Sequence, residues 1–208
     1  MILVRTIHVF IKLVPVILAL RKDRILWISQ EGKDIDEKRF QRNAQRILNT
    51  CISLGPVFIK FGQWLSSRAD ILPQPYLKEL SKLQDSVPAV SFEKIRPIIE
   101  EDIGKIEEKF DKLDQNSLSG ASLGQVHLAI KNGQQVIVKV RRPGIEKQVE
   151  RDLKVLMKII PFAMKFVDPN LRFSIIPIMK QFAESIHEEM DYSKESENLK
   201  KIKKNMEA

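Results

Sequence analysis

The period of the hydrophobic and polar positions changes twice along the chain. Up to about residue 115, apolar residues recur at the three- and four-residue intervals of helices that share a core. From about residue 116 to 140 they alternate with polar residues, as in strands with one buried face. From Pro143 the helical period returns. The pattern predicts an α+β fold, with a helical N-terminal half, a small antiparallel sheet and further helices.

Capping residues and prolines predict where the helices begin. Asp34 or Asp36 can cap a helix that runs to about residue 53, and Pro56 then begins the next one. Pro75 begins a short helix, and Ser91 caps another that ends near residue 104. Two helices are expected after the sheet, from about residue 145 to 166 and from about residue 173 into the charged C-terminus.

Two alternating stretches flank an Asn-Gly pair. Val126, Leu128 and Ile130 alternate with other residues, and the run QQVIVKV follows Asn132 and Gly133. Both central residues of a tight hairpin turn need positive φ, which Asn and Gly adopt at little cost. The segment therefore predicts a β-hairpin.

The second strand of this hairpin carries Lys139 between two valines. A lysine in mid-strand must reach solvent or meet an anion. Before the first strand, Ser119, Ala121 and Gly124 occupy the three glycine positions of the G-x-G-x-x-G-x-V loop with which protein kinases cover ATP phosphates, and Val126 occupies its valine position. Two interpretations stay open: a kinase-like phosphate loop, or an ordinary edge hairpin with a solvated lysine.

Acidic residues gather on the last predicted helix, in the segment EEMDYSKE. On a continuous helix, Glu188, Asp191, Tyr192 and Glu195 share one face. The neighbouring Met190 indicates that part of this face is packed. A solvated acidic helix is the alternative.

Composition narrows the functional classes. The 208 residues carry 35 Lys and Arg against 27 Asp and Glu, a formal net charge of +8. Basic and acidic residues are interleaved and no aromatic-basic module accompanies them, so nucleic acid is not an expected partner. The single cysteine, Cys51, excludes an internal disulfide and a thiolate metal cluster, and we expect it to fill the core. No metal site is predicted.

The first 24 residues are apolar with basic residues among and after them. The longest apolar run, from Leu13 to Leu20, contains Pro15 and falls short of the ~20 residues of a spanning helix. No small-residue cleavage site follows it. The sequence thus predicts a cytoplasmic chain without a transmembrane segment. Its first helix is either packed on the core or lies on an anionic membrane surface.

Four segments in sequence order resemble the motifs of the UbiB (AarF, ADCK-type) family of atypical kinase-like proteins. They are FIKFGQ, SGASLGQVH, VIVKVRRPGI and EMDYSKE. The first is similar to the family's K-x-G-Q motif and the last to its E-x-D motif with a downstream glutamate. The residues that carry these two motifs are Lys60, Gly62, Gln63, Glu189, Asp191 and Glu195.

The resemblance implies a nucleotide site. In it, Lys139 pairs with Glu195, Lys60 approaches Glu189 and Asp191, and Gln63 faces the same cavity. ATP and Mg²⁺ are the cofactors expected of a complete family member. The residues assigned to nucleotide binding are Ser119, Gly120, Ala121, Ser122, Gly124, Val126, Ile137, Lys139 and Glu195.

The chain departs from the family pattern in three ways. The loop reads Ser-Gly-Ala-Ser instead of a run of alanines, and Ile137 replaces an alanine on the side of the strand that bears Lys139. No HxD-like or DFG-like motif, which would hold Mg²⁺ and position the acceptor, occurs in the sequence. We therefore expect a helical extension over residues 1–115, a kinase-like N-lobe over 116–208 and no C-lobe.

The expected function is that of the N-terminal portion of a UbiB-type kinase or ATPase, inactive alone, in ubiquinone or other prenylquinone-lipid metabolism. The alternative is a non-catalytic docking module. The expected partners are a separate C-lobe chain, and an anionic membrane surface or a prenylquinone lipid.

Overall fold

A computed structural model describes residues 2–33, 35–85, 89–164 and 171–207. The N-terminal part contains α1 (Ile2–Ser29), α2 (Glu37–Leu54), α3 (Pro56–Leu65), α4 (Gln74–Leu80) and the 3-10 helix η1 (Ser81–Asp85). The Asp36 carboxylate caps α2 by accepting a hydrogen bond from the Arg39 amide. Asp34 lies outside the described residues. The predicted helix starts at Pro56 and near Pro75 are confirmed.

The sheet has three antiparallel strands in the order β1 (Lys112–Gly120), β2 (Gly124–Lys131) and β3 (Gln134–Arg141). Asn132 and Gly133 join β2 to β3 with φ values of 52° and 74°, which confirms the predicted hairpin. The strand before it, β1, was not predicted. α5 (Phe92–Ile103) and α6 (Ile106–Lys109) precede the sheet, and α7 (Ile145–Met164), α8 (Leu171–Met190) and α9 (Tyr192–Met206) follow it.

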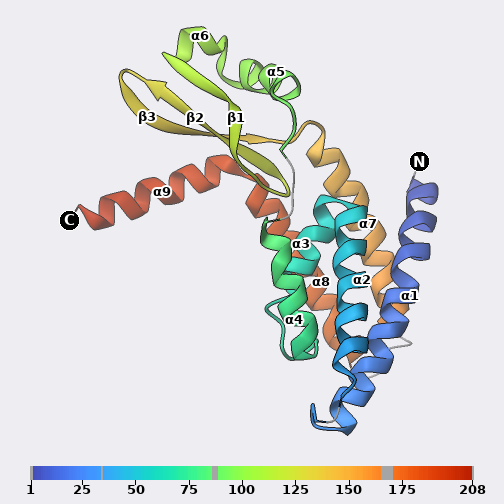
Figure 1. Cartoon of the computed structure of the whole chain (residues 1–208). Coiled ribbons are helices and arrows are strands. Elements are labelled where there is room, and N and C mark those ends of the chain that lie inside the picture. The colour runs from blue at the N-terminus through green and yellow to red at the C-terminus, as the bar shows by residue number, and fades with distance from the viewer. Residues whose placement is uncertain (1, 34, 86–88, 165–170, 208) are drawn as a thin grey trace.

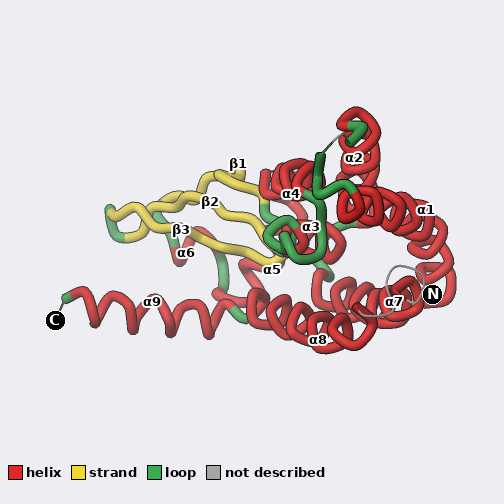
Figure 2. The backbone as a smooth tube through the Cα atoms, turned by 90° about the horizontal axis from the view of Figure 1, so that it is seen from below, coloured by secondary structure: helices red, strands yellow, loops and turns green. Residues whose placement is uncertain are grey.

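Two hydrophobic clusters form separate cores. The larger lies among α1, α2, α3, α4, α7 and α8, which form the helical bundle of Figure 1. The smaller joins α5 and α6 to one face of the sheet through Ile95, Ile99, Ile106 and Val140. α5, α6 and the first residues of β1, all before residue 116, therefore pack with the sheet, whereas α1 to α4 pack in the bundle. The predicted domain division at residue 115 stays a prediction. Figures 1 and 2 both show α9 leaving the bundle and running beside the sheet.

The segment after α8 corrects the prediction of one continuous helix. The helix stops at Met190, and Asp191 has a non-helical backbone with φ −87° and ψ 85°. Its carboxylate accepts a hydrogen bond from the Lys194 amide at 3.0 Å and so caps α9. Aspartate is among the best residues for this position because its oxygen satisfies an otherwise unpaired amide. Glu188 and Glu195 consequently lie on different helices and share no helical face.

The first helix continues through Pro15 and packs on the bundle with Val9, Leu13 and Val16. It has 28 residues and a mean hydropathy of 2.0 in its most apolar window, of which 17% is buried. By length and composition alone it could cross a membrane, although one such helix near an N-terminus is a weak indication. The prediction that no segment could span a membrane is therefore not confirmed.

Buried ion pairs attach both ends of α1 to the bundle. Near its start, Arg5 Nη2 lies 2.7 Å from Asp152 Oδ2, and Asp152 is fully buried. Near its end, the fully buried Asp23 lies 2.8 Å from Arg39 and accepts a hydrogen bond of 2.7 Å from the Tyr76 hydroxyl. These pairs hold the helix along the side of the bundle.

Candidate nucleotide site

The loop between β1 and β2 is held by backbone hydrogen bonds on both sides. The Ala121 amide donates to the Gly124 carbonyl at 2.9 Å, and the Arg142 amide donates to the Leu123 carbonyl at 3.0 Å. Arg142 Nε also donates to the Ala121 carbonyl at 3.0 Å, and burial lowers the pKa of this guanidinium. The Ser122 hydroxyl is buried without a hydrogen-bond partner. The loop therefore has a defined shape, and it holds one buried hydroxyl whose hydrogen bonding is unsatisfied.

Close packing explains why a glycine occupies position 124. A Cβ there would lie 2.7 Å from the Val140 carbonyl oxygen and 2.3 Å from the Tyr192 hydroxyl. Both distances are far below van der Waals contact. Gly124 therefore lets the loop, β3 and the start of α9 approach one another.

Lys139 and Glu195 form the expected ion pair. The ammonium lies 2.7 and 2.9 Å from the two carboxylate oxygens and 4.6 Å from the centre of the Tyr192 ring. Burial, with Glu195 and Glu189 nearby, raises the pKa of Tyr192 to about 12. The Lys139 and Glu195 side chains are 37% and 46% exposed, and Lys139 lies with the exposed Ile137 on the less buried face of β3. The pair is thus solvated, and its contribution to stability is at most about 1 kcal/mol.

The K-x-G-Q residues connect α3 to two different neighbours. Lys60 forms an ion pair with Glu189 at the end of α8, whereas Asp191 caps α9. A Cβ on Gly62 would lie 2.4 Å from Leu83 Cδ1, so this glycine permits α3 to approach η1. The Gln63 amide donates to the Leu83 carbonyl at 2.8 Å.

A cavity of about 460 Å³ lies between β3 and α9. Its polar side holds the Lys139–Glu195 pair, and its apolar side is formed by Leu199 and Ile202. Ile137, which is 64% exposed, lies two residues before Lys139 on the same side of the strand. The described residues that line the cavity are Lys139, Glu188, Glu189, Lys194, Glu195, Asn198, Leu199 and Ile202. Gln63 was expected to face the same cavity but is not among them; its side chain bonds to Leu83 instead.

A buried polar pair on β2 escaped the sequence interpretation. Gln125 and His127 are 1% and 0% exposed. The Gln125 side chain accepts from the Val90 amide at 2.8 Å and donates to the Val90 carbonyl at 3.1 Å. His127 Nδ1 faces the Asp114 carbonyl at 2.8 Å and so carries the proton, which leaves Nε2 to accept from Gln125 at 2.8 Å. This network attaches the central strand to the segment before α5.

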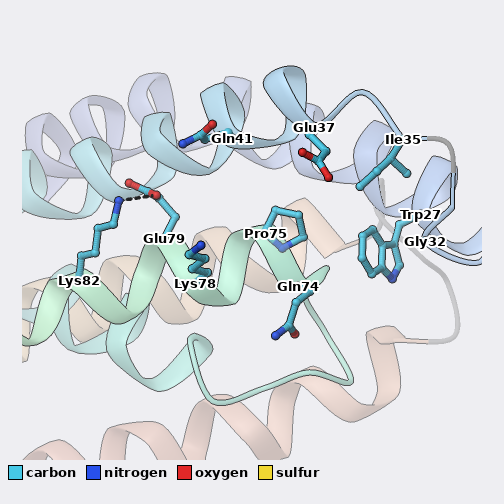
Figure 3. Close-up of a pocket in the computed structure, with 10 residues that line it drawn as sticks. All are labelled: Trp27, Gly32, Ile35, Glu37, Gln41, Gln74, Pro75, Lys78, Glu79 and Lys82. Atoms are coloured by element: carbon cyan, nitrogen blue, oxygen red, sulfur yellow. Dashed lines mark hydrogen bonds and ion pairs between the residues drawn. The ribbon is translucent and has the colours of Figure 1, made fainter.

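A larger cavity, of about 1070 Å³, lies away from these motifs between the end of α1, α2 and α4 (Figure 3). Trp27 and Pro75 form apolar walls, and the Glu79 carboxylate accepts from Lys82 at 2.7 Å. None of the motif residues lines it. The candidate site is therefore placed by its chemistry and not by cavity size.

The residues around Lys139 suit a nucleotide's phosphates better than its metal. An ammonium, a buried hydroxyl without a partner and a glycine at a close approach are groups that bind phosphate. Among the described residues, no group of three or more His, Cys, Asp or Glu side chains could hold a metal ion. The described residues therefore offer groups that suit phosphate, and among them no site for Mg²⁺.

A small-residue loop between two strands, a lysine on the third strand and a glutamate on a following helix together define the N-lobe of a protein-kinase-like fold. A family model for the ABC1 atypical kinase-like domain matches residues 82–208. The chain belongs to this family and is of the UbiB type.

Several relatives support this assignment. A chloroplastic protein of Arabidopsis thaliana, Protein ACTIVITY OF BC1 COMPLEX KINASE 8, is 40% identical over 82% of this chain and 23% of its own length. A probable protein kinase UbiB of Marinobacter nauticus is 38% identical over 74% of this chain and 28% of its own. The chain thus spans about a quarter of these two relatives.

A solved structure, the complex of Rv3197 with erythromycin from Mycobacterium tuberculosis, is 27% identical. The match covers 64% of this chain and 34% of the chain in that structure, with a TM-score of 0.38.

Proposed function

We propose that the chain supplies the phosphate-binding half of a UbiB-type kinase-like ATPase. In this proposal the loop 119–124 and Lys139 bind the phosphates of ATP, and Glu195 orients the Lys139 ammonium. The residues that hold Mg²⁺ and position the acceptor come from a C-lobe. The resemblance to UbiB-type proteins supports a role in ubiquinone or other prenylquinone-lipid metabolism.

One observation carries the proposal: the Lys139–Glu195 pair stands beside the loop. It joins β3 to α9. Tyr192, whose ring lies beneath the ammonium, has its hydroxyl 2.3 Å from where a Cβ on Gly124 would stand. A triphosphate in the loop would meet an ammonium whose position is already fixed. Fixed donors bind an anion better than mobile ones because less conformational entropy is lost.

Replacing the lysine tests the site. We expect Lys139→Met to weaken binding of trinitrophenyl-ATP at least about tenfold, since a charge-assisted contact is removed. Lys131→Met is the matched control, because Lys131 is an exposed lysine at the end of β2. Fluorescence titration measures both, on the chain alone and mixed with the C-lobe of a UbiB relative. Equal affinities in the two variants, or no saturable binding in either mixture, would refute the assignment.

The isolated chain should not hydrolyse ATP, because it has no HxD-like or DFG-like motif and no described metal site. Magnesium-dependent phosphate release is the measurement, with Lys139→Met to identify contaminating activity. Release that exceeds the blank and disappears in Lys139→Met would contradict the expectation.

A docking module is the second candidate function. The described part of α9 has no buried residue, and its Leu199, Ile202 and Met206 are 61%, 54% and 83% exposed. These residues recur at intervals of three and four, as on a helix that packs against a partner. Addition of a relative's C-lobe separates the candidates: the ATPase proposal expects hydrolysis to appear, and the docking proposal expects a complex without hydrolysis.

A further inference from the structure

Two groups of the candidate site lie on one face of the sheet. Gly124 and Val126 are two residues apart on β2, and Val126 is the register partner of Lys139 on β3. Side chains two residues apart on a strand point to the same face, and so do those of directly opposed residues on neighbouring strands. The other face packs on α5 and α6 through Val138 and Val140. The face that bears Gly124 and Lys139 is therefore the one left for a ligand.

A third group reaches this face from α9. Tyr192 is the first residue of α9 and directly follows the cap Asp191. The centre of its ring lies 4.6 Å from the Lys139 ammonium, and its hydroxyl oxygen lies 2.3 Å from where a Cβ on Gly124 would stand. The hydroxyl thus lies against the backbone at the end of the loop, on the side to which a side chain at position 124 would point. The Tyr192 side chain therefore extends from the lysine to the loop.

The Tyr192 hydroxyl is a donor without an acceptor in the chain. Among the described residues it has no hydrogen-bond partner, and, unlike the Ser122 hydroxyl, it is not buried from solvent. Partial burial of the side chain, with Glu195 and Glu189 nearby, raises the pKa of Tyr192 to about 12. The phenol therefore keeps its proton at neutral pH and can donate one hydrogen bond to a ligand on this face.

We propose that the Tyr192 hydroxyl donates a hydrogen bond to a phosphate group of the bound nucleotide. This inference rests on the proposed function, in which the loop 119–124 and Lys139 bind the phosphates of ATP. A phosphate group has several strong acceptor oxygens, so one group can accept from the Lys139 ammonium and from the Tyr192 hydroxyl together. Because Glu195 lies three residues further along α9, the same helix orients the ammonium and supplies the second donor.

Two other roles for Tyr192 lead to different results. If the ring only fills the space between β3 and α9, a phenylalanine in its place would bind ATP as well as the tyrosine does. If the side chain occupies the place of the phosphates, removal of the hydroxyl would strengthen ATP binding. The unpaired and accessible hydroxyl favours the binding role, because a ring that only fills space needs no polar end.

Phenylalanine at this position tests the proposal, because it keeps the ring beneath Lys139 and removes only the hydroxyl. We expect Tyr192→Phe to weaken ATP binding at least about fivefold, through loss of a hydrogen bond to a charged group, and to leave adenosine binding within about twofold. Competition with trinitrophenyl-ATP measures both, on the whole chain alone and mixed with the C-lobe of a UbiB relative. Tyr76→Phe is the matched control. It removes the only other tyrosine hydroxyl, which donates to the buried Asp23, and should lower stability without changing ATP affinity.

The small number of tyrosines also allows a direct spectroscopic measurement. The chain has two tyrosines, so a sample labelled with ¹³C at tyrosine Cζ gives two resonances, which Tyr192→Phe assigns. The shift of Cζ responds to hydrogen bonding of the phenol. We expect ATP, and tripolyphosphate at higher concentration, to move the Tyr192 resonance and to leave that of Tyr76 in place. Because tripolyphosphate has no adenine, a shift with it reports the phosphate contact.

Three results would overturn the proposal. The first is ATP affinity in Tyr192→Phe equal to or tighter than that of the wild type. The second is an equal loss of affinity for ATP and adenosine, which would assign Tyr192 a structural role. The third is a Tyr192 resonance that neither ATP nor tripolyphosphate moves. Lys139→Met separates this inference from the proposed function: if Lys139→Met weakens ATP binding and Tyr192→Phe does not, only this inference fails, and if neither variant weakens it, both fail.

Discussion

Asp152→Ala should lower the free energy of unfolding by about 3–5 kcal/mol, the usual cost of removing one partner of a buried ion pair. Asp152 is fully buried and accepts hydrogen bonds from Arg5 Nε at 2.9 Å, Arg5 Nη2 at 2.7 Å and Arg151 Nε at 3.0 Å. Its loss leaves the Arg5 guanidinium, in a side chain only 18% exposed, with the Leu54 carbonyl as its described acceptor. Urea denaturation followed by circular dichroism measures the change.

A second Arg–Asp pair provides the control. Arg68 and Asp70 form the same two-bond geometry, at 2.8 and 2.6 Å, but the Asp70 side chain is 60% exposed. Asp70→Ala should cost less than about 1 kcal/mol because water replaces the lost partner. If Asp152→Ala costs no more than Asp70→Ala, the buried pair does not hold α1 on the bundle.

Gly124→Ala should destabilise the fold by about 1–3 kcal/mol and weaken nucleotide binding at least about tenfold. The new Cβ would lie 2.7 Å from the Val140 carbonyl, a backbone atom, so either the loop or β3 must move. Both carry groups of the candidate site. Urea denaturation measures stability, and trinitrophenyl-ATP titration measures the loss of binding.

Two further variants separate the clash with the Val140 carbonyl from the general cost of replacing a glycine and from the contact with Tyr192. Gly133 has a φ of 74°, and a Cβ there would meet no atom within 4 Å. Gly133→Ala should therefore cost about 1 kcal/mol of stability, because alanine disfavours positive φ, and should leave nucleotide binding unchanged. Tyr192→Phe in the Gly124→Ala background removes the 2.3 Å contact with the hydroxyl and leaves the contact with Val140. Tyr192→Phe should therefore restore only part of the stability that Gly124→Ala loses. Wild-type stability in Gly124→Ala would contradict the close approach.

Local signals were enough to predict several element boundaries. The cap at Asp36, the proline at the start of α3 and the Asn-Gly turn each act within a few residues. Such features are encoded where they act, so the sequence displays them directly. The order of the four motifs likewise predicted the family, which the match over residues 82–208 confirms.

Long-range packing explains what the sequence did not reveal. The alternation of β2 favours Val126 and Leu128 as its buried side, yet Gln125 and His127 are the more buried residues. Their polar groups are satisfied by Val90 and Asp114, which lie more than ten residues away in the chain. Nothing within β2 itself indicates these partners.

The same limit applies to the candidate site. The family resemblance implied that Lys139 pairs with Glu195, and the structure shows the pair. It could not show that Asp191 ends α8, because aspartate at that position is compatible with both a helix interior and a cap. Nor could it show that the pair is solvated, which depends on how little of that face of β3 the rest of the chain covers.

The attachment of α1 has a consequence for synthesis of the chain. Asp23 finds Arg39 and Tyr76 soon after it leaves the ribosome, because they follow within 53 residues. Arg5 must wait for Asp152, which lies 147 residues later. At typical elongation rates this is roughly seven to thirty seconds. During that interval the first turns of the helix are held at one end only, and their apolar residues are open to chaperones.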